Sequence, residues 1–141
     1  MRYYSIDQFL TTHQTALAGL MEAAQRAAGG HYATMTPIQL QQTAAGDATQ
    51  LITALRNSPA LRESYQENAR GVDGNGVALD DLQRLADAVE AHFVPYFSAQ
   101  LGDEPDLREE LLRRLRHVNG RFRAGTRAVQ IDKTIRRMHT D

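Results

Sequence analysis

The sequence predicts an all-α protein, a bundle of helices with a long C-terminal helix. Apolar residues recur at three- and four-residue spacing along most of the 141 residues, whereas the two-residue alternation typical of strands is nearly absent. Capping residues, glycines and prolines divide this pattern into five or six segments with short connections, which is the organisation of a helical bundle.

The first two helices have start and stop signals in the sequence. Ser5 and Gln8 match a capping box, and Gly29-Gly30 stops the helix that begins there. Thr36-Pro37 starts the second helix, with proline at the first helical position. Asn57-Ser58-Pro59 ends it and caps a short third helix that carries Leu61, Tyr65 and Ala69.

The fourth helix should run from Leu79 to Phe97. Pro95 lies inside its apolar pattern and removes one backbone donor, so we expect a kink or a break near His92 to Val94. Asp103, Pro105 and Asp106 then open the last and longest helix. The apolar residues on the inner face of all these helices form the predicted core: Phe9, Leu17, Leu20, Leu51, Ile52, Leu55, Leu82, Leu85, Val89, Phe93, Leu111, Leu115, Val118 and Phe122.

After Gly125 the apolar pattern of the last helix continues in a different phase, with the four-three alternation of a coiled coil. We call this stripe the seam: Ala124, Ala128, Ile131, Ile135 and Met138. Because an exposed apolar stripe needs cover, the seam predicts a homodimer about a two-fold axis. Residues 1–123 would then form the bundle, and residues 124–141 a helical extension toward a following domain. In the alternatives, this segment folds back onto its own chain or frays without its natural partner.

The composition is that of a soluble globular domain, with 42% hydrophobic and 23% charged residues. The absence of cysteine excludes disulfides, thiolate metal sites and cysteine nucleophiles. No apolar run approaches the roughly 20 residues that span a membrane, and the first ten residues lack the apolar centre of a signal peptide. We therefore expect a cytoplasmic protein that does not contact a membrane.

The stretch RGVDGNGVALDDL, residues 70–82, has the appearance of a calcium-binding loop. The register that places Gly76 at the sixth position of such a loop puts Asp73 and Asn75 at ligand positions. It also puts Gly71 and Leu82 at the first and twelfth positions, where two essential carboxylates are missing. A surface connection between helices explains the stretch better than a metal site does.

Other candidate chemistry is scattered. The five histidines lie on different predicted elements without the spacing of a metal clamp, and His92, next to Phe93, is the best of them as a haem ligand. The acidic pairs Asp80-Asp81, Asp103-Glu104 and Glu109-Glu110 lie near helix starts, where they complement the helix dipole. No set of residues forms a recognisable catalytic pattern, so we expect neither an enzyme nor a cofactor.

Charge is distributed unevenly along the chain. Residues 1–112 carry seven Lys or Arg against fifteen Asp or Glu, whereas residues 113–141 carry nine against two. An Arg-rich helix can bind nucleic acid through phosphates, and this is the rival function class. The interleaved aromatics and helix-turn-helix spacing of such proteins are missing, which favours a solvated basic face that pairs with the acidic body.

The order of features resembles the helical N-terminal sensor domain of Rsb-type stressosome proteins, which are co-antagonists and anti-sigma-factor antagonists. The resemblance covers nearly the whole chain. It rests on a tyrosine, a capped helix start, a Leu-rich second helix, an Arg before an apolar Leu-x-x-Leu pair, and an acidic loop before the last helix. These features are Tyr32, Thr36-Pro37, Leu51 to Leu55, Arg70, Leu79 to Leu82, and Asp103 to Asp106.

This resemblance implies a globin-like or four-to-five-helix bundle that dimerises and binds no haem. It also implies a non-catalytic regulatory input module of bacterial stress signalling, which passes a signal through its C-terminal helix to a following STAS or PAS domain. Other stressosome proteins would be its partners, and a small molecule is a possible ligand.

Overall fold

The computed structural model describes residue 3, residues 5–56 and residues 79–140, with side chains at 3, 5–56 and 80–123. Across these residues the protein is all-α, as predicted, and contains no strand. The short helix predicted around Leu61 and the glycine-rich connection before Leu79 lie outside the described residues. The elements are α1 (Ile6–Thr12), α2 (Gln14–Ala28), η1 (Gly30–Thr34), α3 (Pro37–Leu55), α5 (Leu79–Gln100) and α6 (Pro105–Thr140).

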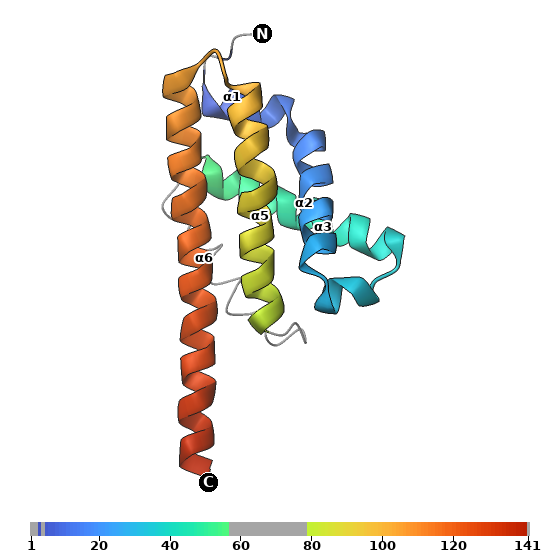
Figure 1. The fold of residues 1–141 in the computed structure, drawn as a ribbon, viewed down its shortest axis with the longest axis vertical. Coiled ribbons are helices and arrows are strands. Elements are labelled where there is room, and N and C mark those ends of the chain that lie inside the picture. Colours follow the sequence, from blue (N-terminus) through green and yellow to red (C-terminus); the bar gives the residue numbers. More distant parts are fainter. Residues whose placement is uncertain (1–2, 4, 57–78, 141) are drawn as a thin grey trace.

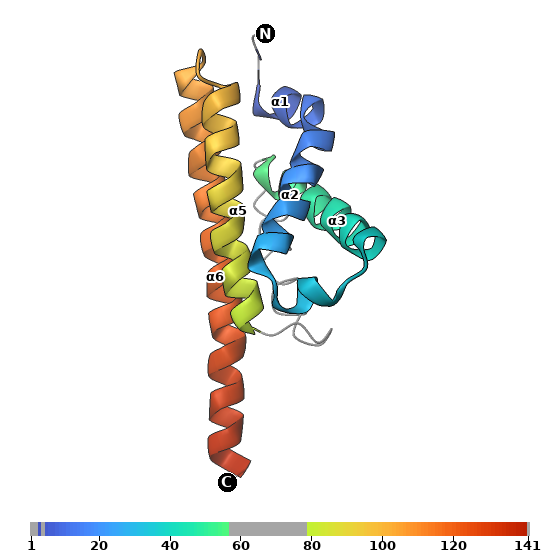
Figure 2. The same cartoon turned by 45° about the vertical axis from the view of Figure 1, so that its right-hand side comes forward.

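The helices form a bundle in which α1, α2 and α3 pack against an antiparallel α5–α6 hairpin (Figure 1). α2 runs antiparallel to α5 and packs against it, while α3 crosses the other helices at a steep angle and contacts both α2 and α6. Figure 2 shows α1, α2 and α3 gathered on one side of the hairpin. The chain therefore brings both ends of α2 close to the two ends of α5.

The predicted caps are confirmed where the structure describes them. The Ser5 hydroxyl accepts a hydrogen bond from the Gln8 amide at 3.1 Å, and Thr36 forms a complete capping box with Gln39. α2 ends at Gly29, and α6 starts with Pro105 at its first position. These local signals fix the helix starts without help from distant residues.

The predicted core is confirmed at thirteen of its fourteen positions, which are all less than 9% exposed. Leu20 is the exception, because it lies at the edge of the apolar face of α2 and is half-buried against the core. Phe97 and Leu101, at the end of α5, are fully enclosed as well. Burial of this apolar surface is the main favourable contribution to folding.

Two local predictions are corrected by the structure. The first helix is divided at His13, whose ψ of 12° is not helical, into α1 and α2. The break expected near His92 to Val94 does not occur, because α5 continues through Pro95. Pro95 and Ala91, the residue whose carbonyl loses its helical partner, are both exposed, so water can bond to that carbonyl.

α6 is much longer than its neighbour in the hairpin. It has 36 residues and α5 has 22, which at about 1.5 Å per residue leaves roughly 20 Å of α6 without α5 beside it. Figure 1 shows this part of α6 projecting past the start of α5. Ala128 to Met138 of the seam lie on this projecting part and Ala124 lies just before it, and the side chains of all five lie outside the described ones.

Candidate functional site

The most distinctive polar group is the His13 cluster, which consists of His13, Tyr3 and Tyr96. The Nε2 atom of His13 lies 2.7 Å from the hydroxyl of Tyr3, and its Nδ1 atom lies 2.5 Å from the hydroxyl of Tyr96. Both ring nitrogens are therefore engaged in hydrogen bonds. The three residues come from the N-terminal segment, the junction of α1 and α2, and the last turns of α5.

Aromatic rings enclose this cluster on its inner side. The His13 ring stacks on Phe9, with centroids 4.3 Å apart and an interplanar angle of 28°. Tyr3 meets Phe9 edge to face at 5.1 Å, and Phe9 in turn contacts Phe97 of α5. Such edge-to-face and offset contacts are the favoured geometries of aromatic pairs. The imidazole is thus held on one face by apolar contact and at both nitrogens by hydroxyl groups.

The environment of His13 favours the neutral ring. Burial lowers the pKa of His13 below its ordinary value of 6.5. Burial and, after it, the neighbouring Tyr3 raise the pKa of Tyr96. A neutral imidazole offers one N–H donor and one acceptor, so one tyrosine hydroxyl donates to the ring and the other accepts from it.

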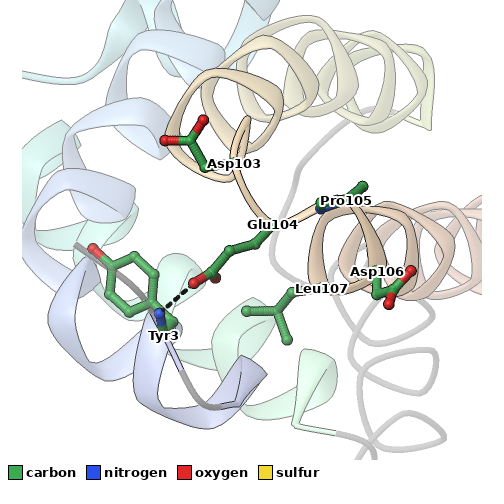
Figure 3. A pocket seen from close by; sticks show the side chains of 6 residues that line it. All are labelled: Tyr3, Asp103, Glu104, Pro105, Asp106 and Leu107. Atoms are coloured by element: carbon green, nitrogen blue, oxygen red, sulfur yellow. Dashed lines mark hydrogen bonds between the residues drawn. The ribbon is translucent and has the colours of Figure 1, made fainter.

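A small pocket adjoins the cluster at the start of α6 (Figure 3). The backbone amide of Tyr3 donates to Oε1 of Glu104 at 2.7 Å, which links the N-terminal segment to the connection between α5 and α6. The pocket has a volume of about 230 Å³ and is lined by Tyr3, Asp103, Glu104, Pro105, Asp106 and Leu107. Ligand pockets usually measure about 300–1,000 Å³, so this one is smaller than a site for a metabolite-sized ligand.

A second polar contact joins the opposite ends of α2 and α5. The buried carboxylate of Asp81 accepts from the backbone amide of His31 at 3.0 Å and pairs with Arg84. Arg84 also donates to the carbonyl oxygen of Ala28 at 3.1 Å. Gly30 has a φ of +57°, and a Cβ atom there would collide with the carboxylate of Asp81. The carboxylate therefore occupies the space that only glycine leaves open.

A third polar contact lies between α2 and α3. Gln25 is fully buried, and its Nε2 donates to Oδ2 of Asp47 at 2.7 Å. Burial raises the pKa of Asp47 to about 6, and the hydrogen bond from Gln25 opposes this shift. Burial also raises the pKa of the nearby Tyr32, with further contributions from Asp47 and then Asp81. Oε1 of Gln25 is buried and has no hydrogen-bond partner among the described residues.

The candidate residues singled out in the sequence are not brought together. His92 is half-buried, and its Nδ1 lies 2.8 Å from the carbonyl oxygen of Ala88 on its own helix. The described residues contain no group of three or more His, Asp or Glu side chains placed to hold a metal ion. Of the acidic pairs, Asp81 lies in the buried contact with Arg84, whereas Glu110 forms exposed ion pairs with arginines of its own helix.

The arginines of α6 with described side chains mostly contact acidic residues. Arg113 and Arg114 both pair with Glu110, at 2.6 and 2.9 Å, and these hydrogen bonds lower the pKa of Glu110 to about 2. Arg123 lies 2.6 Å from Asp87 of α5 and 3.6 Å from Glu90. The predicted pairing of the basic segment with the acidic body is therefore confirmed for these three arginines.

Sequence reasoning did not single out the His13 cluster. Tyr96 follows His13 by 83 positions, and no local pattern connects them. The nearest signal is the polar THQT stretch inside the first apolar pattern, which marks a weak point of the helix but not its partners.

Comparison of the chain with models of protein families, with curated proteins and with solved structures gave no significant match. In the part of the chain that the structure describes, no helix combines the length and the apolar composition needed to cross a membrane.

Proposed function

We propose that this chain is a non-catalytic regulatory input module of a cytoplasmic bacterial stress-signalling protein of the anti-sigma-factor antagonist type. It acts as a homodimer and passes a signal through α6 to a following STAS or PAS domain and to other stressosome proteins. The proposal rests on the resemblance of the sequence to Rsb-type sensor domains and on the form of α6.

The length of α6 is the observation that carries the proposal. Its first part packs against α5 and α3, and Leu111, Leu115 and Val118 are completely buried there. Its last part continues as a helix to Thr140 without α5 beside it. A long helix that leaves a bundle is suited to join it to a partner, because a helix is stiff along its axis and transmits displacement of its packed end. The seam supplies the apolar spacing for a second copy.

The use of polar groups in the bundle supports a non-catalytic role. The buried Asn119 of α6 donates to the carbonyl oxygen of Ala86 at 3.0 Å and to Glu90 at 2.9 Å, which fixes α6 against α5. Asp81 is likewise bonded to backbone and to an arginine. Groups committed to such contacts stabilise the packing of helices and are not poised for proton transfer to a substrate.

Sedimentation or light scattering at tens of micromolar tests the dimer. We expect the parent chain to be dimeric, and Ile131→Asp with Ile135→Asp to shift it toward monomer while the helicity of the bundle persists. Ile38→Asp is the matched control, because Ile38 is an isoleucine that is 67% exposed at the start of α3, whereas Leu55 at the other end of this helix accepts from Arg114 of α6. A monomeric parent chain, or a double variant that stays fully dimeric, would overturn the role of the seam.

Titration with duplex DNA and RNA at low and moderate salt tests the rival function. The module should bind neither tightly, since Arg113, Arg114 and Arg123 are engaged by carboxylates. Tight binding that weakens steeply with rising salt would instead assign the basic segment to nucleic acid.

A further inference from the structure

The junction of α1 and α2 is a break that the local sequence does not require. Residues 6–28 carry one continuous helical pattern, and the residue at the break is neither glycine nor proline. The i to i−4 hydrogen bonds continue on both sides, from the amide of His13 to Phe9 and from the amide of Leu17 to His13. Contacts of the His13 side chain therefore act at a weak point of the helix and define where it changes direction.

These contacts join three parts of the molecule at one ring. Tyr3 belongs to the N-terminal segment, which is also bonded to Glu104 ahead of α6, and Tyr96 belongs to α5. His13 itself belongs to the junction. The ring thus links the N-terminal segment, the junction of α1 and α2, and the α5–α6 hairpin.

We propose that His13 is a proton-operated hinge: its neutral imidazole ties Tyr3 and Tyr96 to the junction of α1 and α2, and protonation releases this tie. The neutral ring has one donor and one acceptor and satisfies both hydroxyls. The imidazolium has two donors, so the hydroxyl that donated to the ring must turn and find another acceptor. The charged ring, which is half-buried, also lacks water on the face that stacks on Phe9.

No carboxylate compensates the charged ring among the described contacts of His13. The other charged or titratable groups on the surrounding elements are bonded elsewhere: Asp7 and Arg56 pair with each other at 2.8 Å, and His92 bonds to its own helix. Glu104 accepts from a backbone amide. Opening the junction hydrates the imidazolium, and the opened segment is free to adopt the continuous helix that its sequence favours.

The direction of the pH response follows from this scheme. The closed state binds the proton on His13 less readily than the open state, where the ring is solvated and titrates near its ordinary value of 6.5. The closed state, in which His13 is bonded to Tyr3 and Tyr96, is therefore most stable above pH 6.5. Its stability relative to the open state decreases as the pH falls below this value. Between the pKa of His13 in the open state and its lower pKa in the closed state, the equilibrium constant for opening increases about tenfold for each unit by which the pH falls. This inference concerns the bundle alone and does not depend on what α6 contacts.

Solution NMR of the full chain between pH 7.5 and 5 tests the hinge. The ring signals give the pKa of His13, and hydrogen exchange of the α1 amides, corrected for its intrinsic pH dependence, gives the opening equilibrium. We expect His13 to titrate below 6.5 and the opening of α1 to increase with its protonation. A pKa at or above 6.5, or titration without a change in opening, would overturn the proposal.

Variants distinguish the hinge from a general effect of acid. His13→Gln keeps one donor and one acceptor but cannot titrate, so the opening equilibrium of α1 should no longer depend on pH. His92→Gln is the matched control, since His92 is half-buried on α5 and its Nδ1 lies 2.8 Å from the carbonyl oxygen of Ala88 on the same helix, and it should retain the dependence. Persistence of the dependence in His13→Gln, or its loss in His92→Gln, contradicts the hinge.

Tyr96→Phe provides an independent readout if His13→Gln does not fold. It keeps the ring of residue 96 and removes one hydroxyl from the His13 cluster, so opening at pH 7.5 should increase about fivefold, as expected for the loss of one hydrogen bond. An opening equilibrium of α1 equal to that of the parent chain would show that the His13 cluster does not stabilise the closed junction of α1 and α2.

Discussion

α2 and α5 are joined by polar contacts at both ends, and the two contacts differ in kind. At the end of α2, a charged pair of Asp81 and Arg84 bonds to the backbone of His31 and Ala28. At its start, a histidine ring lies between two tyrosine hydroxyls. Only the second contact depends on a group that titrates near neutral pH. The same pair of helices is thus joined at one end by the Asp81–Arg84 pair and at the other end by the His13 cluster, whose hydrogen bonds change when His13 is protonated.

The apolar core between these ends should show the largest effect on stability. Leu115 of α6 is fully buried, so Leu115→Ala should lower the free energy of unfolding by about 2–5 kcal/mol. The loss should be the same at pH 5.5 and pH 7.5, because no titratable group is removed. Denaturant or thermal unfolding measures it, and an unchanged midpoint would remove Leu115 from the core.

Gly30→Ala should disrupt the contact between Asp81 and the backbone of His31. The new Cβ would collide with Asp81 and would impose a positive φ on a residue with a side chain. We expect a loss of about 2–4 kcal/mol, from the strained backbone and the displaced buried hydrogen bond.

Gly46→Ala is the control for this variant, since Gly46 lies on α3 with nothing near its added Cβ, and there alanine should stabilise the helix slightly. Equal stability of Gly30→Ala and the parent chain would show that the position of the Asp81 carboxylate does not depend on the absence of a side chain at Gly30.

Asp47 should contribute a pH dependence of the opposite sign from that of His13, because burial raises the pKa of Asp47 and lowers that of His13. The pKa of Asp47 is raised to about 6 in the folded protein, so the folded state binds more protons than the unfolded state between about pH 4 and 6. Acid therefore reduces the cost of burying Asp47. At pH 7 the variant Asp47→Asn should be more stable by about 1–2 kcal/mol, since the carboxylate is partly solvated and the full shift is not realised.

The stability advantage of Asp47→Asn should shrink as the pH falls through 6 and vanish near pH 4. Unfolding curves at several pH values measure it, and a variant less stable than the parent at pH 7 would contradict the assignment.

Much of the fold was predictable because its signals are local. The caps at Ser5 and Thr36 and the stop at Gly29 depend on residues within one turn, and the core follows from apolar spacing within each helix. Pro95 shows the limit of a local rule, because whether proline interrupts a helix depends on whether the freed carbonyl can reach water.

The candidate site was not predictable, because the contacts that join its different helices link residues far apart in the sequence. His13 and Tyr96 are separated by 83 positions, and Asp81 and His31 by 50. Asp81 was interpreted as a residue that complements the helix dipole, and its burial beside Gly30 becomes visible only when α5 meets the loop after α2. Single polar residues on apolar patterns carry no information about which partner satisfies them.

Pairing of two copies along α6 can be tested by cross-linking. The chain has no cysteine, so one introduced cysteine reports on one position. In a parallel pair about a two-fold axis, seam residues meet their own copies within disulfide distance. Ala128→Cys should therefore oxidise rapidly to a covalent dimer at tens of micromolar, and Gln130→Cys, outside the seam, should not. Equal oxidation of both variants, or of neither, would contradict the account.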